Sequence, residues 1–409
     1  MTKPYKLSYY TIFTEPFNDR GQRVLFSTRT GKTLVVPPLC YDFLQNDACE
    51  AIPEPVLTRL RDIRAVVPRD EDELAGIVAE NELAIDNEHT DTLYEVIQPA
   101  AMCQLGCYYC GQQHTKDYLD RTLMDAIVAR VREKASRGTF RRLYIGWFGA
   151  EPLMALRQIR ELTAEFKAIA AERGMTYAAK VVTNGLSLKE GVFVELAKGL
   201  NVDAIEVTLD GTAEFHDRHR YTKEGGASFD LIFKNLRDIL LRDDFPAFNC
   251  RVTIRCNVDE KNVEGVSPLI RLLAEHGMHR RIGYFYPVGV YAWGNDAHKK
   301  SLTKEEFAEK EIGWQVEMMR LGYPFSGLLP TRVRKVCMAV SKHSEMYDAF
   351  GNRFNCTEVS YVPQYVGTPY VLGNLKTPDA QVQHPRSPAA YLRAEQKQRG
   401  RRKRETRRF

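Results

Sequence analysis

Short runs of apolar, β-branched residues alternate with amphipathic segments from about residue 94 onward. Six runs are typical of strands, at residues 93–97, 143–148, 180–183, 204–209, 251–258 and 282–286. Between them, four-residue spacing of apolar positions, as at Leu123, Ile127 and Val131, predicts helices, among them 155–173, 189–199, 229–242, 264–276 and 303–321. Strands that alternate with helices predict a parallel sheet with right-handed crossovers. Six units are fewer than the eight of a closed barrel, so we expect an open, partial TIM-like (β/α)6 barrel over residues 91–300.

Residues 1–90 show a different pattern and predict a small α+β unit. Arg23–Arg29 and Thr33–Val36 form a predicted hairpin with Gly31 in the turn, and helical segments follow at 40–46, at 55–64 and from Asp70 onward. Two interpretations stay open. The unit is either a cap on the main domain or a peptide-docking module, in which a free strand edge pairs with a substrate segment.

Chemically distinctive residues follow the ends of the predicted strands. In chain order these are Cys103–Cys110, Gly149–Pro152, Thr183–Gly185, Thr208–Gly211, Asn257 and Tyr286–Pro287. The carboxyl ends of parallel strands meet at one rim, where the βα loops converge. The pattern therefore predicts one functional site built from six loops.

Bulk properties narrow the class of protein. The chain has 409 residues, of which 44% are hydrophobic and 27% charged, as in a folded, water-soluble enzyme. No apolar run is long enough to span a bilayer, and the N-terminus lacks the features of a signal peptide. We therefore expect a cytoplasmic protein without a membrane partner. Nine cysteines, three of them within eight residues, indicate metal binding rather than a disulfide scaffold.

The tight cluster reads Cys103-Gln-Leu-Gly-Cys107-Tyr-Tyr-Cys110. Its spacing allows three thiolates to hold three irons of a four-iron cluster, so that the fourth iron keeps an open position for chemistry. Two alternatives stay open at this point. His114 would complete a Cys3His zinc site, or the cysteines are incidental core residues. The remaining cysteines are read as core residues, except for Cys337 and Cys356.

This segment resembles the CxxxCxΦC motif (Φ, aromatic) of radical S-adenosylmethionine (SAM) enzymes, and the resemblance covers about residues 94–300. It implies a 4Fe–4S cluster on Cys103, Cys107 and Cys110, with SAM chelating the open iron. It also implies reductive cleavage of SAM to a 5′-deoxyadenosyl radical that abstracts hydrogen from a substrate. The external electron donor would be a flavodoxin or a ferredoxin.

The same resemblance implies roles for residues at the other strand ends. Gly149-Ala150-Glu151-Pro152 is similar to the family's GGEP motif, with Ala150 in place of the second glycine and Glu151 bonded to the methionine ammonium. A solvated loop carboxylate is the alternative for Glu151. Arg220 would pair with the methionine carboxylate unless it is a surface arginine. Polar contacts to ribose and methionine, or else strand-end caps, are expected of Asn184, Thr208, Asp210 and Asn257.

The run from Leu209 to Arg220 looks like the LDG…HD..R signature of peptide- and protein-modifying members, which include anaerobic sulfatase maturases. Such relatives carry a C-terminal SPASM domain with auxiliary clusters. Cys337, Gly351 and Cys356 fit its opening pattern, but no cysteine follows Cys356. We therefore interpret residues 301–375 as a helical linker and an incomplete SPASM-like region, an irregular extension in which Cys337 and Cys356 are candidate auxiliary-cluster ligands.

Residues 376–409 form a predicted disordered tail. From residue 386 it carries a net charge of +8, so the formal +5 of the whole chain leaves about −3 for residues 1–385. The abrupt end of the cysteine pattern suggests that the natural C-terminus has been lost or replaced. Nucleic-acid binding by the tail is disfavoured, since no aromatic residues interleave with its basic ones.

The leading hypothesis is a maturase that abstracts hydrogen from a ribosomally made peptide or a protein side chain. A second is a radical SAM enzyme acting on a small molecule or a nucleic acid. A third, from another class, is a non-catalytic protein that binds a cluster or zinc. The residues do not identify a catalytic acid or base, although Asp210, Asp217 and Tyr286 are candidates by position.

Overall fold

The computed structural model describes residues 4–86, 91–291, 294–324, 331–333, 337–341, 343–368 and 370–377. The predicted tail lies outside these residues, apart from 376 and 377. The described residues form two compact units. An N-terminal unit contains residues up to 86 together with those from 331 to 340, and a barrel unit contains the remainder. No helix among the described residues is long and apolar enough to cross a membrane.

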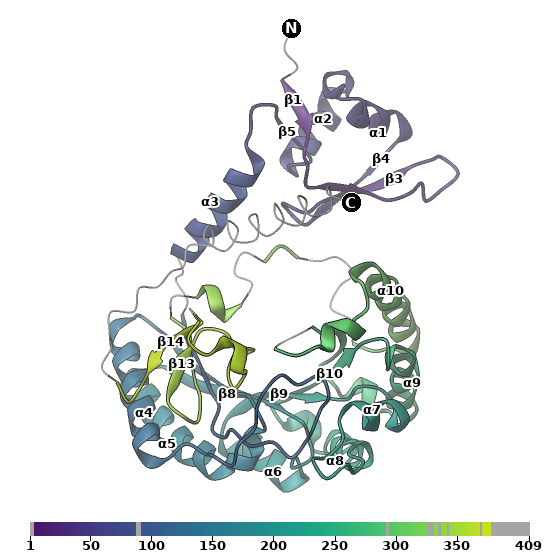
Figure 1. Cartoon of the computed structure of the whole chain (residues 1–409). Coiled ribbons are helices and arrows are strands. Elements are labelled where there is room, and N and C mark those ends of the chain that lie inside the picture. The colour runs from purple at the N-terminus through teal and green to yellow at the C-terminus, as the bar shows by residue number, and fades with distance from the viewer. Residues whose placement is uncertain are drawn as a thin grey trace, which may run out of the picture. The chain divides into compact units, whose positions relative to one another are not determined.

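The barrel unit is built on one sheet of nine strands, shown in Figure 1 with helices around its outer side. Its strand order is β11-β10-β9-β8-β7-β6-β12-β13-β14, and the six strands from β6 to β11 are parallel. The bounds of these six are β6 Thr92–Ile97, β7 Arg142–Trp147, β8 Thr176–Thr183, β9 Val202–Thr208, β10 Arg251–Val258 and β11 Tyr284–Gly289. The predicted partial barrel of six parallel strands is thus confirmed.

Helices follow the strands as right-handed crossovers require. They are α4 Arg121–Arg137, α5 Leu156–Glu172, α6 Glu190–Val194, α7 Ala213–His219, α8 Phe229–Leu240, α9 Val266–Glu275 and α10 Lys304–Leu321. The end of α6 continues as a π-helical turn over Glu195–Gly199. Local signals set several starts: Asp120 accepts a hydrogen bond from Leu123 N at the start of α4, and Thr303 with Glu306 forms a capping box on α10.

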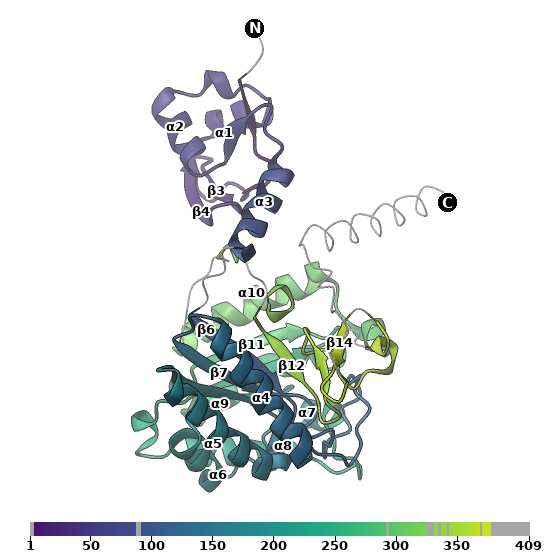
Figure 2. The same ribbon diagram turned by 90° about the vertical axis from the view of Figure 1, so that its left-hand side faces the viewer.

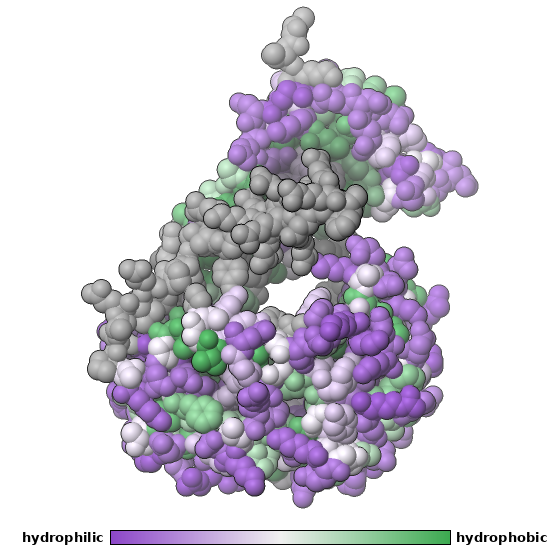
Figure 3. Space-filling model, in the orientation of Figure 1, coloured by the Kyte–Doolittle hydropathy of each residue, from purple (hydrophilic) through white to green (hydrophobic). Residues whose placement is uncertain are grey.

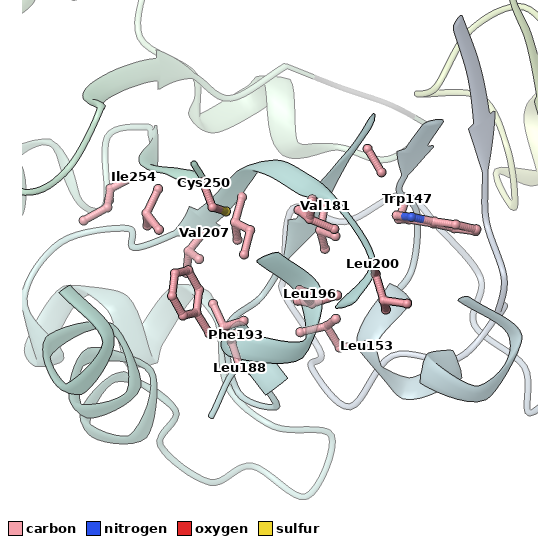
Figure 4. Packing of buried hydrophobic residues seen from close by; sticks show 14 of the residues in the cluster. Trp147, Leu153, Val181, Leu188, Phe193, Leu196, Leu200, Val207, Cys250 and Ile254 are labelled. Atoms are coloured by element: carbon pink, nitrogen blue, oxygen red, sulfur yellow. The ribbon is translucent and has the colours of Figure 1, made fainter. Parts of the chain in front are cut away.

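The core of this unit lies between the sheet and its helices. Alternate strand residues point outward into it, and Figure 4 shows Val181, Val207 and Ile254 of the sheet gathered in one layer with Leu188, Phe193 and Leu196. Cys250 and Cys256 are buried in the same cluster, as expected for core residues. The surface seen in Figure 3 is mostly hydrophilic, with scattered hydrophobic residues.

Three short strands in the C-terminal extension were not evident from the sequence pattern. They are β12 Glu345–Tyr347, β13 Asn352–Phe354 and β14 Val371–Asn374. β12 pairs in parallel with β6, and β13 and β14 continue the sheet in antiparallel fashion, as the side view of Figure 2 shows. Gly351, at φ 83°, lies in the turn between β12 and β13. The extension is therefore part of the sheet rather than irregular throughout.

The N-terminal unit has its own core and two small sheets. β1 Tyr5–Leu7 pairs with β5 Val66–Pro68, and β2 Thr11–Phe13, β3 Arg23–Ser27 and β4 Lys32–Val36 form a three-stranded sheet. The hairpin predicted around Gly31 is present, with that glycine at φ 70°. Three helices complete the unit: α1 Pro38–Gln45, α2 Glu54–Asp62 and α3 Glu73–Asp86. Cys40 and Cys49 belong to its core.

Candidate active site

A cavity of about 230 Å³ opens at the carboxyl ends of the parallel strands. Cys103, Cys107 and Cys110 all line it. Four of the residues predicted at other strand ends line it as well, namely Asn184, Thr208, Arg220 and Asn257. Residues that are up to 154 positions apart in the chain thus meet because parallel strands deliver their loops to one rim.

The thiol of Cys103 receives two weak hydrogen bonds. Leu105 N and Asn184 Nδ2 donate to its Sγ over 3.4 and 3.8 Å. Burial raises the pKa of Cys103 to about 12 and that of Cys107 to about 11, and it also raises the pKa of Cys110. The thiols are therefore protonated at neutral pH without a metal, and a metal would have to displace their protons on binding. N–H donors to sulfur are what cluster-bound thiolates use, so this donor set fits an iron–sulfur cluster.

His114, the fourth ligand of the alternative zinc site, also lines the cavity. Burial lowers its pKa to about 4, which keeps the ring neutral. Within the described part of the chain, however, no three His, Cys, Asp or Glu side chains converge closely enough to hold a single metal ion. The geometry of the described residues therefore does not form a ready-made Cys3His zinc site.

The segment after β7 makes two left-handed backbone turns in succession. Gly149 has φ 76° and Ala150 has φ 47°. A side chain at Gly149 would place its Cβ 1.9 Å from Gln98 Nε2, and this close approach together with the left-handed backbone favours glycine there. Ala150 keeps the left-handed conformation although it replaces the second glycine of the GGEP pattern, and Gln112 Oε1 accepts a hydrogen bond from its N–H at 3.1 Å. The substitution therefore leaves the turn in place at a cost in backbone strain.

Glu151 is fully buried, which rules out the solvated loop carboxylate. Its carboxylate accepts hydrogen bonds from Thr183 Oγ1 at 2.7 Å, Asn184 N at 2.7 Å and Leu153 N at 3.0 Å. Burial raises its pKa, against the effect of these donors. Glu151 is not among the residues that line the cavity, so what the structure displays is its anchoring of the Thr183–Asn184 turn beneath the cavity wall.

A second network joins the cysteine loop to the ends of β9 and β10. The Tyr109 hydroxyl donates to Asp210 Oδ2 at 2.6 Å and accepts from Arg220 Nη1 at 2.6 Å and Asn257 Nδ2 at 3.0 Å. Asp210 is fully buried, does not line the cavity, and accepts a further bond from Asn257 N at 2.8 Å. Asp210 is thus held behind the wall, whereas Arg220 and Asn257 are presented to the cavity.

Arg220 is a buried cation rather than a surface arginine. Only 7% of it is exposed, and among the described residues its Nε has no hydrogen-bond partner. Burial alone would lower its pKa, but Cys107, Tyr109 and Asp210 outweigh that effect and raise it, so the guanidinium stays charged. A buried, charged donor that faces a cavity is suited to an anionic group of a ligand.

The other candidates from sequence lie apart from this cavity. Cys337 is exposed and belongs to the N-terminal unit, while Cys356 is partly buried in the barrel unit. Asp217 accepts hydrogen bonds from Ser228 N and Phe229 N, and Tyr286 donates to Glu206 at 2.7 Å. Neither Asp217 nor Tyr286 lines the cavity, so the structure does not support them as acid or base.

Three residues of the site had not been identified from the sequence. No polar contact was predicted for Tyr109, and Arg255 and Glu358 were not singled out although both line the cavity. Arg255 lies two residues before Asn257 on β10, and strand alternation would have placed both on one face. Glu358 comes from the segment after β13, for which the sequence offers no signal.

The comparisons with known proteins agree with this architecture. Residues 97–242 match the model of the radical SAM superfamily, so the chain contains a radical SAM domain, which supports its classification as an enzyme. That match includes the cysteine loop and the strand ends as far as Arg220.

Two curated relatives match part of the chain. An uncharacterized protein of Synechocystis sp. is 30% identical over 139 residues, covering 32% of this chain and 34% of the relative. A serine-type anaerobic sulfatase-maturating enzyme of Bacteroides thetaiotaomicron is 27% identical over 150 residues, 35% of this chain and 36% of the relative. The match thus spans about a third of the length of these curated relatives.

Solved structures share the fold at low sequence identity. The enzyme anSMEcpe with bound AdoMet and Kp18Cys peptide is 15% identical, with a TM-score of 0.51 over 72% of this chain and 81% of that one. SuiB of Streptococcus suis, bound to its precursor peptide SuiA, is 13% identical, with a TM-score of 0.51 over 94% and 89% of the two chains. These likenesses confirm the fold.

Proposed function

We propose that the protein is a radical SAM enzyme that abstracts hydrogen from a ribosomally made peptide or a protein side chain. When bound, a 4Fe–4S cluster would supply the electron that breaks the sulfonium of SAM to yield the 5′-deoxyadenosyl radical. The observation that carries the proposal is the shared cavity, in which three thiols of one short loop face polar groups from three further strand ends.

Each residue has a separate task in this proposal. Cys103, Cys107 and Cys110 hold the cluster, and the N–H groups of Leu105 and Asn184 stabilise the charge on the first thiolate. Arg220 binds the methionine carboxylate, which its unpaired Nε and retained charge favour. Contacts to the remainder of SAM come from Asn184, Thr208 and Asn257, while Glu151 and Asp210 orient these groups from behind.

The peptide substrate is supported by the relatives and by the N-terminal unit. AnSMEcpe and SuiB were solved with peptides bound, and one curated relative matures a sulfatase. In the N-terminal unit, β2 and β4 are the edges of their sheet, and Ile12 and Val35 are 57% and 53% exposed. An extended peptide can add to such an edge and cover such apolar side chains.

Two partners and a second cluster complete the proposal. A flavodoxin or a ferredoxin in the cytoplasm would deliver the electron. Cys356 would take part in an auxiliary cluster. The iron content would then exceed about four per chain, and Cys356→Ser would lower it to about four. An iron content that this substitution leaves unchanged would remove the auxiliary cluster from the proposal.

Anaerobic reconstitution with iron and sulfide tests the function. The expected product is a brown protein with about four irons per open-site cluster that forms 5′-deoxyadenosine from SAM when dithionite is added. A colourless protein that binds one zinc per chain would overturn the proposal. Peptides encoded beside the gene would then be tested as substrates and for binding to residues 1–90. If residues 1–90 bind none of them, the docking role is rejected.

A further inference from the structure

Tyr108 and Tyr109 are neighbours in the cysteine loop, yet their hydroxyl groups have opposite surroundings. The Tyr108 hydroxyl is shielded from solvent and has no hydrogen-bond partner among the described residues. The Tyr109 hydroxyl makes three hydrogen bonds, to Asp210, Arg220 and Asn257. A hydroxyl has one donor and two acceptor sites, so every site of Tyr109 is used and its proton is directed at Asp210.

The hydroxyl of Tyr109 lies between two buried side chains of opposite charge. Arg220 and Asp210 are both buried, and no ion pair within 4 Å joins them among the described residues. Tyr109 stands between them instead, accepting from the guanidinium and donating to the carboxylate. Without this oxygen, a buried arginine and a buried carboxylate would gain most by pairing directly.

We propose that Tyr109 is a positioning residue that keeps Arg220 from pairing with Asp210 and so reserves the guanidinium for the carboxylate of SAM. The inference rests on the proposed function, because its ligand is the nucleotide bound in this cavity. It also ties the cysteine loop, through one side chain, to the ends of β9 and β10, so the loop that holds the cluster also orders the groups that hold SAM.

The geometry of the guanidinium supports this role. Its Nη1 bond to Tyr109 is the one side-chain hydrogen bond that Arg220 donates among the described residues, and its Nε is buried without a partner. Asp210, by contrast, accepts from Asn257 N at 2.8 Å and from Asn257 Nδ2 at 3.3 Å. Loss of the tyrosine oxygen would therefore leave Asp210 anchored and Arg220 free to rotate toward it.

Binding of SAM to the reconstituted protein, measured by equilibrium dialysis, tests the proposal. Tyr109→Phe should raise the Kd for SAM about tenfold, the scale expected for a displaced charge-assisted contact, while iron and sulfide content stay at the wild-type level. Tyr108→Phe is the matched control, since it removes a hydroxyl without partners from the adjacent position, and it should leave the Kd unchanged.

A double-mutant cycle separates positioning from general support. Tyr109→Phe should weaken SAM binding in the wild-type background but have no further effect beside Arg220→Gln, because the arginine through which it acts is gone. Effects that add in the double variant, an unchanged Kd in Tyr109→Phe, or a loss of iron in that variant would each overturn the positioning role. A wild-type protein that binds no SAM would instead overturn the proposed function, so the two failures are distinguishable.

Discussion

Two polar networks in the barrel unit, one between the sheet and helix α4 and one at the carboxyl ends of the strands, differ in how their charged groups are paired. On the helix-facing side, Glu95 of β6 pairs with Lys134 of α4 at 2.5 Å, and Arg130 donates to both carboxylate oxygens of Glu345 at 2.7 and 2.8 Å. At the carboxyl edge, Arg220 contacts a neutral hydroxyl and has no carboxylate within 4 Å in the described part of the chain.

The two networks differ in whether the buried cation already has a carboxylate partner. In the Glu95 network each carboxylate has a cation within contact distance, Lys134 for Glu95 and Arg130 for Glu345, and the network joins β12 to the sheet. In the Tyr109 network the cation beside the cavity contacts a hydroxyl instead of a carboxylate, so its guanidinium has donors left for an anionic group of a ligand.

The largest expected effect comes from the cysteine loop, which contributes Tyr109 to the network at the carboxyl ends of the strands. Cys107→Ala should abolish both the brown colour and the formation of 5′-deoxyadenosine, because two thiolates do not hold the cluster. Cys256→Ala is the control, since that thiol is fully buried in the core behind the sheet. Iron content after anaerobic reconstitution measures both, and full iron in the Cys107 variant would refute the ligand assignment.

The next largest effects come from replacing one arginine in each network, in two separate variants. Arg130→Gln should lower the free energy of unfolding by about 2 kcal/mol, because it leaves the buried Glu345 carboxylate short of its partner. Arg220→Gln should instead raise the Kd for SAM at least tenfold and leave stability nearly unchanged. Urea unfolding measures the stability of both variants and equilibrium dialysis their affinity for SAM. A reversed pattern would show that Arg130 binds the ligand and that Arg220 is structural.

The two carboxylates of the Glu95 network, Glu95 and Glu345, should affect the pH dependence of stability in opposite directions. Burial raises the pKa of Glu95 from 4.5 to about 7, although Lys134 opposes the shift. Between pH 4.5 and 7 the folded state then holds a proton that the unfolded state has lost, so Glu95 makes stability fall as pH rises through this window.

Glu345 acts in the opposite sense at lower pH. Burial alone would raise its pKa, but Arg130 and Lys134 outweigh burial and lower the pKa to about 2. Its contribution is present above pH 4.5 and is lost as pH falls toward 2.

Glu95→Gln isolates the first of these effects. The variant should lose less stability than wild type between pH 4.5 and 7, by about 2 kcal/mol, since the glutamine has no proton to release. Urea unfolding at the two pH values gives the difference. Parallel behaviour of the two proteins would mean that Glu95 is ionised throughout this range.

The smallest effect concerns the turn after β7. Ala150→Gly should stabilise the protein by less than about 1 kcal/mol, because relief of the left-handed strain is partly offset by the greater freedom of glycine in the unfolded chain. Gly149→Ala, where the new Cβ would meet Gln98, should destabilise it. Thermal unfolding ranks the three proteins, and a destabilised Ala150→Gly would show that Ala150 is not strained.

The sequence predicted those features that depend on residues close together in the chain. The parallel strands appear as short apolar, β-branched runs, and the cysteine loop places its three thiols within eight residues, so both were identified in advance. β12 escaped because it has only three residues and begins with the ion-paired Glu345. The hydrogen bonds of Tyr109 were not predicted because Arg220 and Asn257 lie 111 and 148 residues away in the chain, and only the folded sheet brings them together.

Electron paramagnetic resonance of the reduced protein, with and without SAM, shows whether SAM binds an iron of the cluster in this cavity. The spectrum should show a reduced 4Fe–4S cluster whose signal changes when SAM is added, because the nucleotide binds the iron that the three cysteines leave open. A cluster signal that SAM does not alter, or no iron–sulfur signal at all, would contradict the assignment of this cavity as a radical SAM site.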